Sequence, residues 1–298
     1  MNIYFNDNYT ACDHAFDTTR KSAAIAQSLQ TEPIKGTSIT DPRDSFTTAE
    51  IIIKRMHDQD YVRAIKTGTP IDLAESQGFD WDDGIYEMAV SHNSGLVAAV
   101  DSVVVGKAEW AGSLSSGLHH AKQDAGSGFC TFNGLAVAAQ RAFDLGARNI
   151  LVLDFDAHCG GGTYSMTRHL PVTQIDVSTS SFDHWSKDSD DRWSDLTFST
   201  PEDYLDRIKS ALERASIGHK TTGGWDFVLY NAGMDPANTG VDFATLNKRE
   251  ALVAKCLANL AVPTVIAIAG GYTYGGITMQ RLVDLHRLTF TNFAKWYK

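Results

Sequence analysis

The chain has few cysteines and prolines, with four and seven respectively in 298 residues. The cysteines form no C-x-x-C pair, which excludes a zinc ribbon or a dithiol redox motif. They are spaced widely along the chain, at Cys12, Cys130, Cys159 and Cys256. Free thiols in a reducing compartment are the simplest interpretation. A chain of this length buries most of its surface on folding, so it needs no disulfides to hold a core.

The chain also lacks an excess of basic residues and any long apolar run. The 26 basic residues face 36 acidic ones, a net charge of −10, which argues against a nucleic-acid or anionic-membrane surface. No apolar run approaches the roughly 20 residues that span a bilayer. The start, MNIYFNDNYT, has neither the basic segment nor the apolar stretch of a signal peptide. We therefore expect a soluble, cytoplasmic protein that binds neither nucleic acid nor membranes, of unassigned oligomeric state.

Short apolar segments alternate with segments of helical periodicity. The first kind covers 149–155, 172–178, 227–231 and 263–269, and is rich in β-branched residues. The second kind covers 18–30, 47–65, 131–146, 201–216, 244–260 and 279–297. This alternation predicts an α/β fold with a largely parallel sheet. Because no repeat or linker divides the chain, we expect one domain over residues 1–298.

Polar and glycine-rich clusters follow four of the predicted strands. They cover residues 154–162, 178–181, 232–236 and 270–272. Ligands of open α/β sheets bind outside the carboxyl ends of the strands, so these clusters should converge on one site. Asp154, Asp156 and His158 alternate along an extended segment and therefore form one polar row.

The row can be a strand end with capping carboxylates, or it can hold a metal ion. Two close carboxylates are costly to bury unless a cation or several donors compensate, which favours the metal. Asp156, His158 and Asp235 would leave a coordination position open on a zinc-like ion, as in catalytic sites. Two carboxylates neutralise Zn²⁺ and weaken its Lewis acidity, so protein groups should assist it.

Candidates for that assistance lie in two other segments. His119 and His120 are adjacent in a Gly/Ser-rich stretch, and either could act as general base and then general acid, with Asp154 as a partner for one of them. Tyr272 follows two glycines and could donate a hydrogen bond to a developing oxyanion. The alternatives are structural histidines and a tyrosine that only packs.

Four motifs, taken in order, resemble the zinc-dependent histone deacetylases and acetylpolyamine amidohydrolases. They are GLHHAKQDAGSGFCTFNG (117–134), LDFDAHCGGGT (153–163), NAGMDP (231–236) and AGGYTYGG (269–276), and the likeness runs from about Arg20 to the C-terminus. The resemblance implies the arginase/deacetylase fold, a single domain with a central, mainly parallel sheet flanked by helices. It implies one zinc ion per chain at Asp156, His158 and Asp235.

The resemblance also implies roles around that ion. Water activation falls to His119 and His120, carbonyl polarisation to Tyr272, and contact with His119 to Asp154. The acyl channel would be lined by Phe129, Phe182, Gly128 and Gly271. Arg20 is similar to an arginine of the inner acetate channel. A K⁺ or Na⁺ ion would bind the 154–158 segment, including Asp154, together with Ser178.

Two positions depart from the family pattern. Many relatives carry Asp or Asn where this chain has Gly161, so His120 is predicted to lack its usual partner. The rim aspartate that grips substrate has no clear counterpart, and Asp80 and Asp82 are candidates in what is otherwise a solvated acidic loop.

The expected activity is hydrolysis of an N-acyl amide, such as acetyl-lysine in a protein or peptide, or an acetylated polyamine or other small amine. A catalytically weak acyl-lysine-binding module is the alternative that a missing His120 partner favours. A binuclear manganese ureohydrolase needs a further bridging carboxylate, and the sequence has Gly160 two residues after His158.

Overall fold

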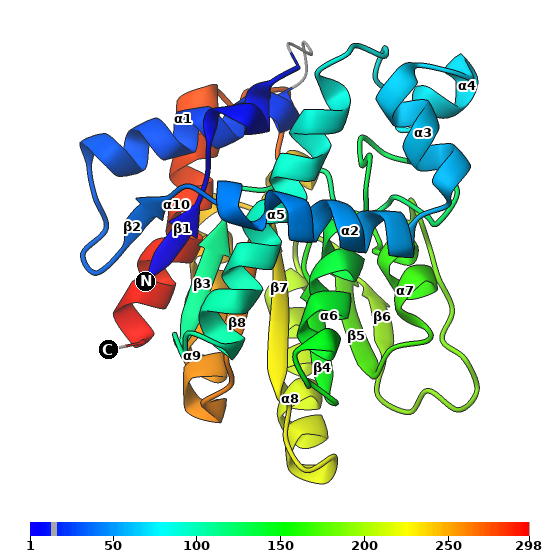
Figure 1. Ribbon diagram of the computed structural model, residues 1–298. Coiled ribbons are helices and arrows are strands. Elements are labelled where there is room, and N and C mark those ends of the chain that lie inside the picture. Colours follow the sequence, from blue (N-terminus) through cyan, green and yellow to red (C-terminus); the bar gives the residue numbers. More distant parts are fainter. Residues whose placement is uncertain (13–16, 298) are drawn as a thin grey trace.

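A parallel β-sheet runs through the middle of the computed structural model, which describes residues 1–12 and 17–297 (Figure 1). Within these residues the sheet has eight strands in the order β2-β1-β3-β8-β7-β4-β5-β6. Every neighbouring pair is parallel. The strands are β1 (Asn2–Tyr4), β2 (Ser38–Thr40), β3 (Trp110–Ser113), β4 (Ile150–Asp154), β5 (Val172–Ser178), β6 (Asp195–Phe198), β7 (Phe227–Gly233) and β8 (Thr264–Ala269). The predicted α/β class with a mainly parallel sheet is confirmed.

Helices cover both faces of the sheet (Figure 1). One face packs against α1 (Asp17–Thr31), α8 (Tyr204–Thr221), α9 (Phe243–Leu260) and α10 (Met279–Trp296). The other packs against α5 (Ile85–Val104) and α6 (Gly134–Asp144), with α2 (Phe46–Met56) and α3 (Gln59–Thr67) outside them. Shorter elements are α4 (Ile71–Ala74), α7 (Gly161–Thr167), η1 (Asp7–Thr10), η2 (Arg43–Ser45) and η3 (Asp235–Thr239). None of the helices in the described ranges combines the length and apolarity that crossing a bilayer requires.

Alternation along β4 explains why its polar residues collect at one end. Leu151 and Leu153 point into the core beneath α8, α9 and α10, while Ile150 and Val152 point into the core beneath α5 and α6. A strand buried on both faces has no solvated side on which to place a charge. Asp154 therefore comes last, where β4 leaves the packed layers and the carboxyl edge of the sheet begins.

The four predicted strands correspond to β4, β5, β7 and β8, and the main differences from prediction lie among the helices. The helix expected over 47–65 is two helices, because His57 is extended and Asp58 begins a new helix by accepting a hydrogen bond from the Asp60 backbone N–H. Helix α5 was not predicted. Nearly all of its side chains are buried, so it lacks the polar stripe that marks an amphipathic helix.

A buried polar network fixes the backbone between Asp154 and Asp156. Arg249 on α9 is fully buried, and its guanidinium donates to the Phe155 carbonyl at 3.0 Å and to Glu250 Oε1 at 2.6 Å. The Tyr204 hydroxyl donates to the same Phe155 carbonyl at 3.3 Å. The network therefore holds the strand end from which the candidate site begins.

We expect Arg249→Ala to lower the free energy of unfolding by about 3–5 kcal/mol, because it leaves the Glu250 carboxylate buried without its ion-pair partner. The exposed neighbour Lys248 is the matched control, and Lys248→Ala should change the free energy by less than about 0.5 kcal/mol. Urea titration measures both values. Equal stability of the two variants would contradict a supporting role for Arg249.

Candidate active site

Asp154, the last residue of β4, connects this strand to its neighbours at the carboxyl ends of the strands. In the sheet register it stands beside Asp176 of β5 and Asn231 of β7. Its Oδ1 accepts hydrogen bonds from Asn231 Nδ2 at 2.9 Å and from the Asp156 backbone N–H at 3.2 Å. Its Oδ2 lies 2.8 Å from His119 Nδ1, so the expected contact between Asp154 and His119 is present.

Asp156, His158 and Asp235 form a compact group of possible metal ligands. Their ligand atoms all lie within 4.8 Å of one another. His158 Nδ1 is 3.2 Å from Asp156 Oδ1 and 3.0 Å from Asp235 Oδ2. Asp235 is held by the Ala157 backbone N–H, which donates to its Oδ1 at 2.8 Å. The structure thus brings the three predicted ligands together from the ends of β4 and β7.

The electrostatics of this group fit a cation. Asp156 Oδ2 is buried and has no hydrogen-bond partner in residues 1–12 and 17–297. Burial, with the nearby charge of Asp156, raises the pKa of the Asp235 carboxyl. Burial disfavours a charged His158 ring, but its hydrogen bonds to Asp156 and Asp235 outweigh this and raise its pKa to about 11. Two buried carboxylates and an imidazole are a donor set that zinc accepts in proteins.

The adjacent histidines lie against this group. Their ring centroids are 3.9 Å apart, and the ligand atoms of His119, His120 and Asp156 also lie within 4.8 Å of one another. Burial disfavours a charged His119, yet the charges of Asp154 and Asp156 raise its pKa to about 10. Burial and the charge of His119 lower the pKa of His120 to about 4. The two rings therefore differ strongly in proton affinity although they are adjacent.

His120 has no partner at position 161, as predicted, but a carboxylate from another segment takes that place. Asp183 Oδ2, in the segment between β5 and β6, lies 3.0 Å from His120 Nδ1. Nothing in the periodicity of the segment around Asp183 singles it out. The contact bridges 63 positions of the sequence, so only the fold reveals it.

Gly128 and Phe182, which are predicted to line the acyl channel, lie at the histidine pair. The Phe182 ring is edge-on to His120, with centroids 4.9 Å apart, and remains 46% exposed, which places it at the mouth of the site. A Cβ at Gly128 would lie 2.5 Å from His120 Cδ2 and 2.8 Å from Phe182 Cε1, so only glycine fits there. The next residue, Phe129, packs on Phe79 with centroids 5.3 Å apart.

The Tyr272 loop closes the site from the end of β8. Gly270 has a φ of 49°, and a Cβ there would lie 2.6 Å from Asp156 Oδ2, so the backbone passes directly over the possible ligands. Asn238 holds the loop: its Nδ2 donates to the Tyr272 carbonyl at 3.0 Å, and its Oδ1 accepts from the Tyr272 N–H at 3.1 Å. Burial, then the charge of Asp235, raises the pKa of the Tyr272 phenol, which therefore stays a proton donor.

Gly271 and Arg20 lie differently from expectation. A Cβ at Gly271 would lie 2.5 Å from Leu282 Cδ1, so its tight approach is to the core. Arg20 is exposed, whereas its neighbour Lys21 is fully buried and its ammonium donates to the Gly270 carbonyl. Lys21, not Arg20, is therefore the cation beneath the Tyr272 loop. Ser178 Oγ donates to the His158 carbonyl at 3.2 Å.

The two rim candidates are also placed. Asp80 is exposed. Asp82 Oδ1 accepts from the Gly84 N–H at 2.8 Å and from Cys12 Sγ at 3.0 Å, which commits this carboxylate oxygen to local contacts. This oxygen of Asp82 is therefore engaged by the fold, whereas Asp80 is exposed to solvent.

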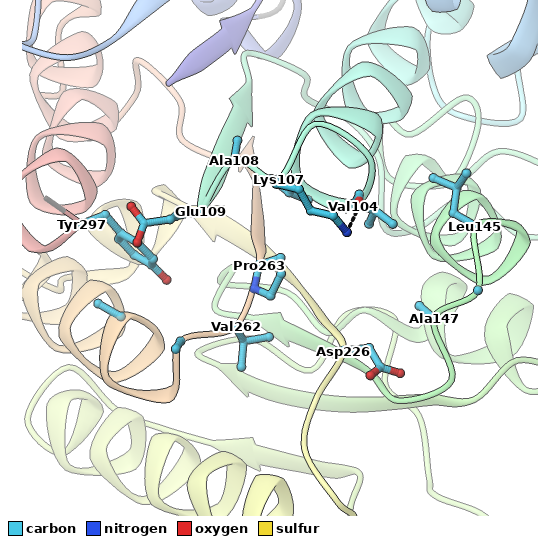
Figure 2. Close-up of a pocket in the computed structure, with 14 residues that line it drawn as sticks. Val104, Lys107, Ala108, Glu109, Leu145, Ala147, Asp226, Val262, Pro263 and Tyr297 are labelled. Atoms are coloured by element: carbon cyan, nitrogen blue, oxygen red, sulfur yellow. Dashed lines mark hydrogen bonds between the residues drawn. The ribbon is translucent and has the colours of Figure 1, made fainter.

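A separate cavity of about 410 Å³ lies at the other end of the strands from the candidate site (Figure 2). Ala147, Asp226 and Pro263, which line it, precede β4, β7 and β8, so it opens at the amino ends of the strands. None of the candidate residues described above lines this cavity.

Fold and site together define an α/β protein with a carboxylate–histidine centre at the carboxyl edge of a parallel sheet. A profile of the histone deacetylase domain matches residues 14–186, more than half of the chain. The chain belongs to the histone deacetylase family.

Similar proteins agree with this family. An uncharacterized protein of Picosynechococcus sp. is 29% identical over 238 residues, which cover 74% of this chain and 75% of the relative. The acetoin utilization protein AcuC of Bacillus subtilis is 35% identical over 137 residues, covering 40% of this chain and only 35% of that relative. The structure superimposes on acetylpolyamine aminohydrolase from Burkholderia pseudomallei with a TM-score of 0.75 and 18% identity, over 99% of both chains. The predicted arginase/deacetylase fold is thereby confirmed.

Proposed function

We propose that this chain is a zinc-dependent amidohydrolase that removes an acyl group, most simply acetyl, from an amine. The observation that carries the proposal is the convergence of three elements at one edge of the sheet. These are the group Asp156, His158 and Asp235, the histidine pair, and the Tyr272 loop. Membership of the histone deacetylase family supports the same class of reaction.

Asp156, His158 and Asp235 would hold the zinc ion. Two carboxylates and one imidazole leave a position open, as in catalytic zinc sites. Zinc supplies Lewis acidity there, polarising the acyl carbonyl and lowering the pKa of water. The alternative group that includes His119 and His120 shares Asp156. It has a single carboxylate, so it compensates less of the ion's charge, and the histidines serve better as proton carriers.

The surrounding residues would move protons and stabilise charge. The histidine pair accepts a proton from the attacking water and returns one to the departing amine. Asp154 orients His119 from the side opposite the possible ligands. Tyr272 donates a hydrogen bond to the carbonyl oxygen as its negative charge grows. We assign these roles by position, because the histidine pair follows β3, Asp154 ends β4 and Tyr272 follows β8.

The substrate we infer is an acetylated unbranched amine. Phe182 and the bare backbone of Gly128 lie beside each other and both crowd the His120 ring, so a chain that enters there should be slim. An acetyl-lysine side chain or an acetylated polyamine presents a slim alkyl chain of that kind. The acetylpolyamine aminohydrolase whose fold is shared is named for such a substrate. A K⁺ or Na⁺ ion near Asp154 and Ser178, and a cytoplasmic location, remain predictions.

The competing functions have less support. The weak acyl-lysine-binding module was favoured by a missing partner for His120, and Asp183 supplies that partner. A binuclear manganese centre needs a third carboxylate, and each possible metal group in the described part of the chain has at most two. Hydrolysis at a single metal ion is therefore the function that the site supports best.

We expect purified protein to contain about one zinc per chain and to hydrolyse at least one of three substrate classes: acetyl-lysine peptides, acetylpolyamines and small N-acetyl metabolites. Metal analysis and a screen of these classes test this. A hydroxamate should inhibit the reaction, and a chelator should abolish it until zinc is restored. His120→Ala is the inactive control. Zinc-replete protein that cleaves none of the three classes would contradict the proposed function.

A further inference from the structure

The carboxylate of Asp183 contacts His120 from a segment that the family motifs do not include. Its Oδ2 lies 3.0 Å from His120 Nδ1 and accepts the Gly162 backbone N–H at 2.9 Å. The side chains of His120 and Asp183 are only 4% and 7% exposed. A buried carboxylate that accepts two N–H groups is fixed in position, so the contact with His120 is specific rather than incidental.

The segment that carries Asp183 is anchored on both sides of it. On one side, the Cys159 backbone N–H donates to the Phe182 carbonyl at 3.0 Å. On the other, the Trp185 indole N–H donates to Asp176 Oδ2 at 2.7 Å, and its ring stacks on Tyr164 at 4.0 Å. Asp183 itself has a φ of 57°, a left-handed conformation that Asp and Asn tolerate better than other side chains. These anchors direct the carboxylate toward His120.

Gly161 leaves the space that Asp183 occupies. A Cβ at Gly161 would collide with the Asp183 carbonyl oxygen and would lie 2.7 Å from Oδ1 and 2.9 Å from Cγ of the same residue. Any side chain at position 161 would therefore displace the Asp183 segment. Position 161 therefore has no side chain of its own, and the carboxylate of Asp183 lies in the space that such a side chain would fill.

We propose that Asp183 is the positioning residue of His120, and that Gly161 is glycine because the Asp183 segment takes its side-chain space. Asp183 accepts a hydrogen bond from the Nδ1–H of His120 and thereby fixes the neutral tautomer and the ring orientation, so that Nε2 exchanges protons with the reactants. His119 has the same arrangement with Asp154. The inference rests on the proposed amidohydrolase function and specifies how its second histidine is held.

Two substitutions separate orientation from mere folding. Asp183→Gly removes the acceptor and suits the left-handed backbone, so it introduces no strain at this residue. Asp183→Asn keeps an oxygen that can accept from Nδ1 and also tolerates this backbone. We expect kcat of Asp183→Gly to fall about ten- to a hundredfold, with KM within about twofold and with unchanged zinc content and hydroxamate affinity. Asp183→Asn should recover most of the lost kcat.

Asp190→Asn is the matched control, since Asp190 is an exposed carboxylate of the same segment, and its kinetics should equal those of the parent. Three results would overturn the inference. One is an Asp183→Gly kcat within about twofold of the parent. Another is loss of zinc or hydroxamate binding in step with kcat. The third is an Asp183→Asn variant as slow as Asp183→Gly.

A spectroscopic measurement tests the same point without turnover. In protein with ¹⁵N-labelled histidine, the His120 signals are identified by their absence in His120→Gln. We expect a protonated Nδ1 and an unprotonated Nε2 in the parent, and a mixture of tautomers in Asp183→Gly. An Nε2–H tautomer in the parent, or no change in the variant, would refute the role. An inactive parent protein would contradict the proposed function but would leave this tautomer test valid.

Discussion

Replacing Tyr272 by Phe should lower kcat by about a hundredfold or more, because the proposed mechanism assigns this phenol as the hydrogen-bond donor to the carbonyl oxygen. Burial, with the charges of Asp235 and Asp156, raises the pKa of this phenol, so the phenol keeps its proton near neutral pH. The ring of the Phe variant can keep its stacking on Tyr274, whose centroid is 5.7 Å away. Initial rates on the substrate identified by the screen measure the effect.

Tyr274 is the matched control for that experiment. It lies two residues further along the same loop, and it is 58% exposed where Tyr272 is largely covered. Tyr274→Phe removes the same hydroxyl from a position that points to solvent, and should leave kcat within about twofold of the parent. Zinc content should be unchanged in both variants. Near-parental turnover of Tyr272→Phe would eliminate the phenol as the oxyanion donor and leave the charge to other groups.

The sequence predicted the part of the fold in which local pattern and burial agree. β4, β5, β7 and β8 are buried on both faces, so each reads as a short apolar run. The outer strands β1 and β2 have only three residues each, too few for a pattern. Helix α5 was missed for the opposite reason, since a helix covered on all sides has no polar face to reveal its period.

The candidate site likewise has residues that the sequence predicts and a contact that it does not. Asp154, Asp156 and His158 could be recognised together because they are close in sequence and alternate along an extended segment. The contact of His120 with Asp183 could not, because it depends on the path of the chain after β5 and on the space left by Gly161. Gly161 suggests from the sequence that His120 has lost its partner. In the structure, the same glycine makes room for Asp183, which is a different partner.

Lys21 and Asn238 illustrate a related limit. Both act on backbone carbonyls of the Tyr272 loop, Lys21 on Gly270 and Asn238 on Tyr272. A side chain that bonds to backbone needs no particular partner residue, so the sequence contains no matching pair to find. The likeness of Arg20 to a family arginine predicts that it is the inner cation, and a shift of one residue along α1 moves a side chain by about 100° around the helix. That rotation separates an exposed arginine from a buried lysine.

Asp235→Ala should remove the zinc ion and, with it, turnover. Asp235 supplies one of only two carboxylates in the group, and without it Asp156 and His158 offer two ligands, too few for a stable zinc site. Metal analysis after desalting should find well under one zinc per chain. Asp242→Asn is the matched control, because it removes an exposed charge from the same segment while Asn still caps α9. This variant should keep zinc and activity.

Thermal unfolding with and without a chelator separates metal loss from misfolding. Zinc that binds only the folded state stabilises it, so a chelator should lower the Tm of the parent protein. The Tm of Asp235→Ala should not respond to the chelator. In the metal-free parent, removal of Asp235 loses the hydrogen bond from the Ala157 N–H and the contact with His158, and this loss is offset because the charge of Asp235 no longer opposes that of buried Asp156. A metal-free variant close in Tm to the chelated parent is therefore expected. Full zinc occupancy in Asp235→Ala would refute the ligand set, because it would mean that the two buried carboxylates are close for a reason other than a shared cation.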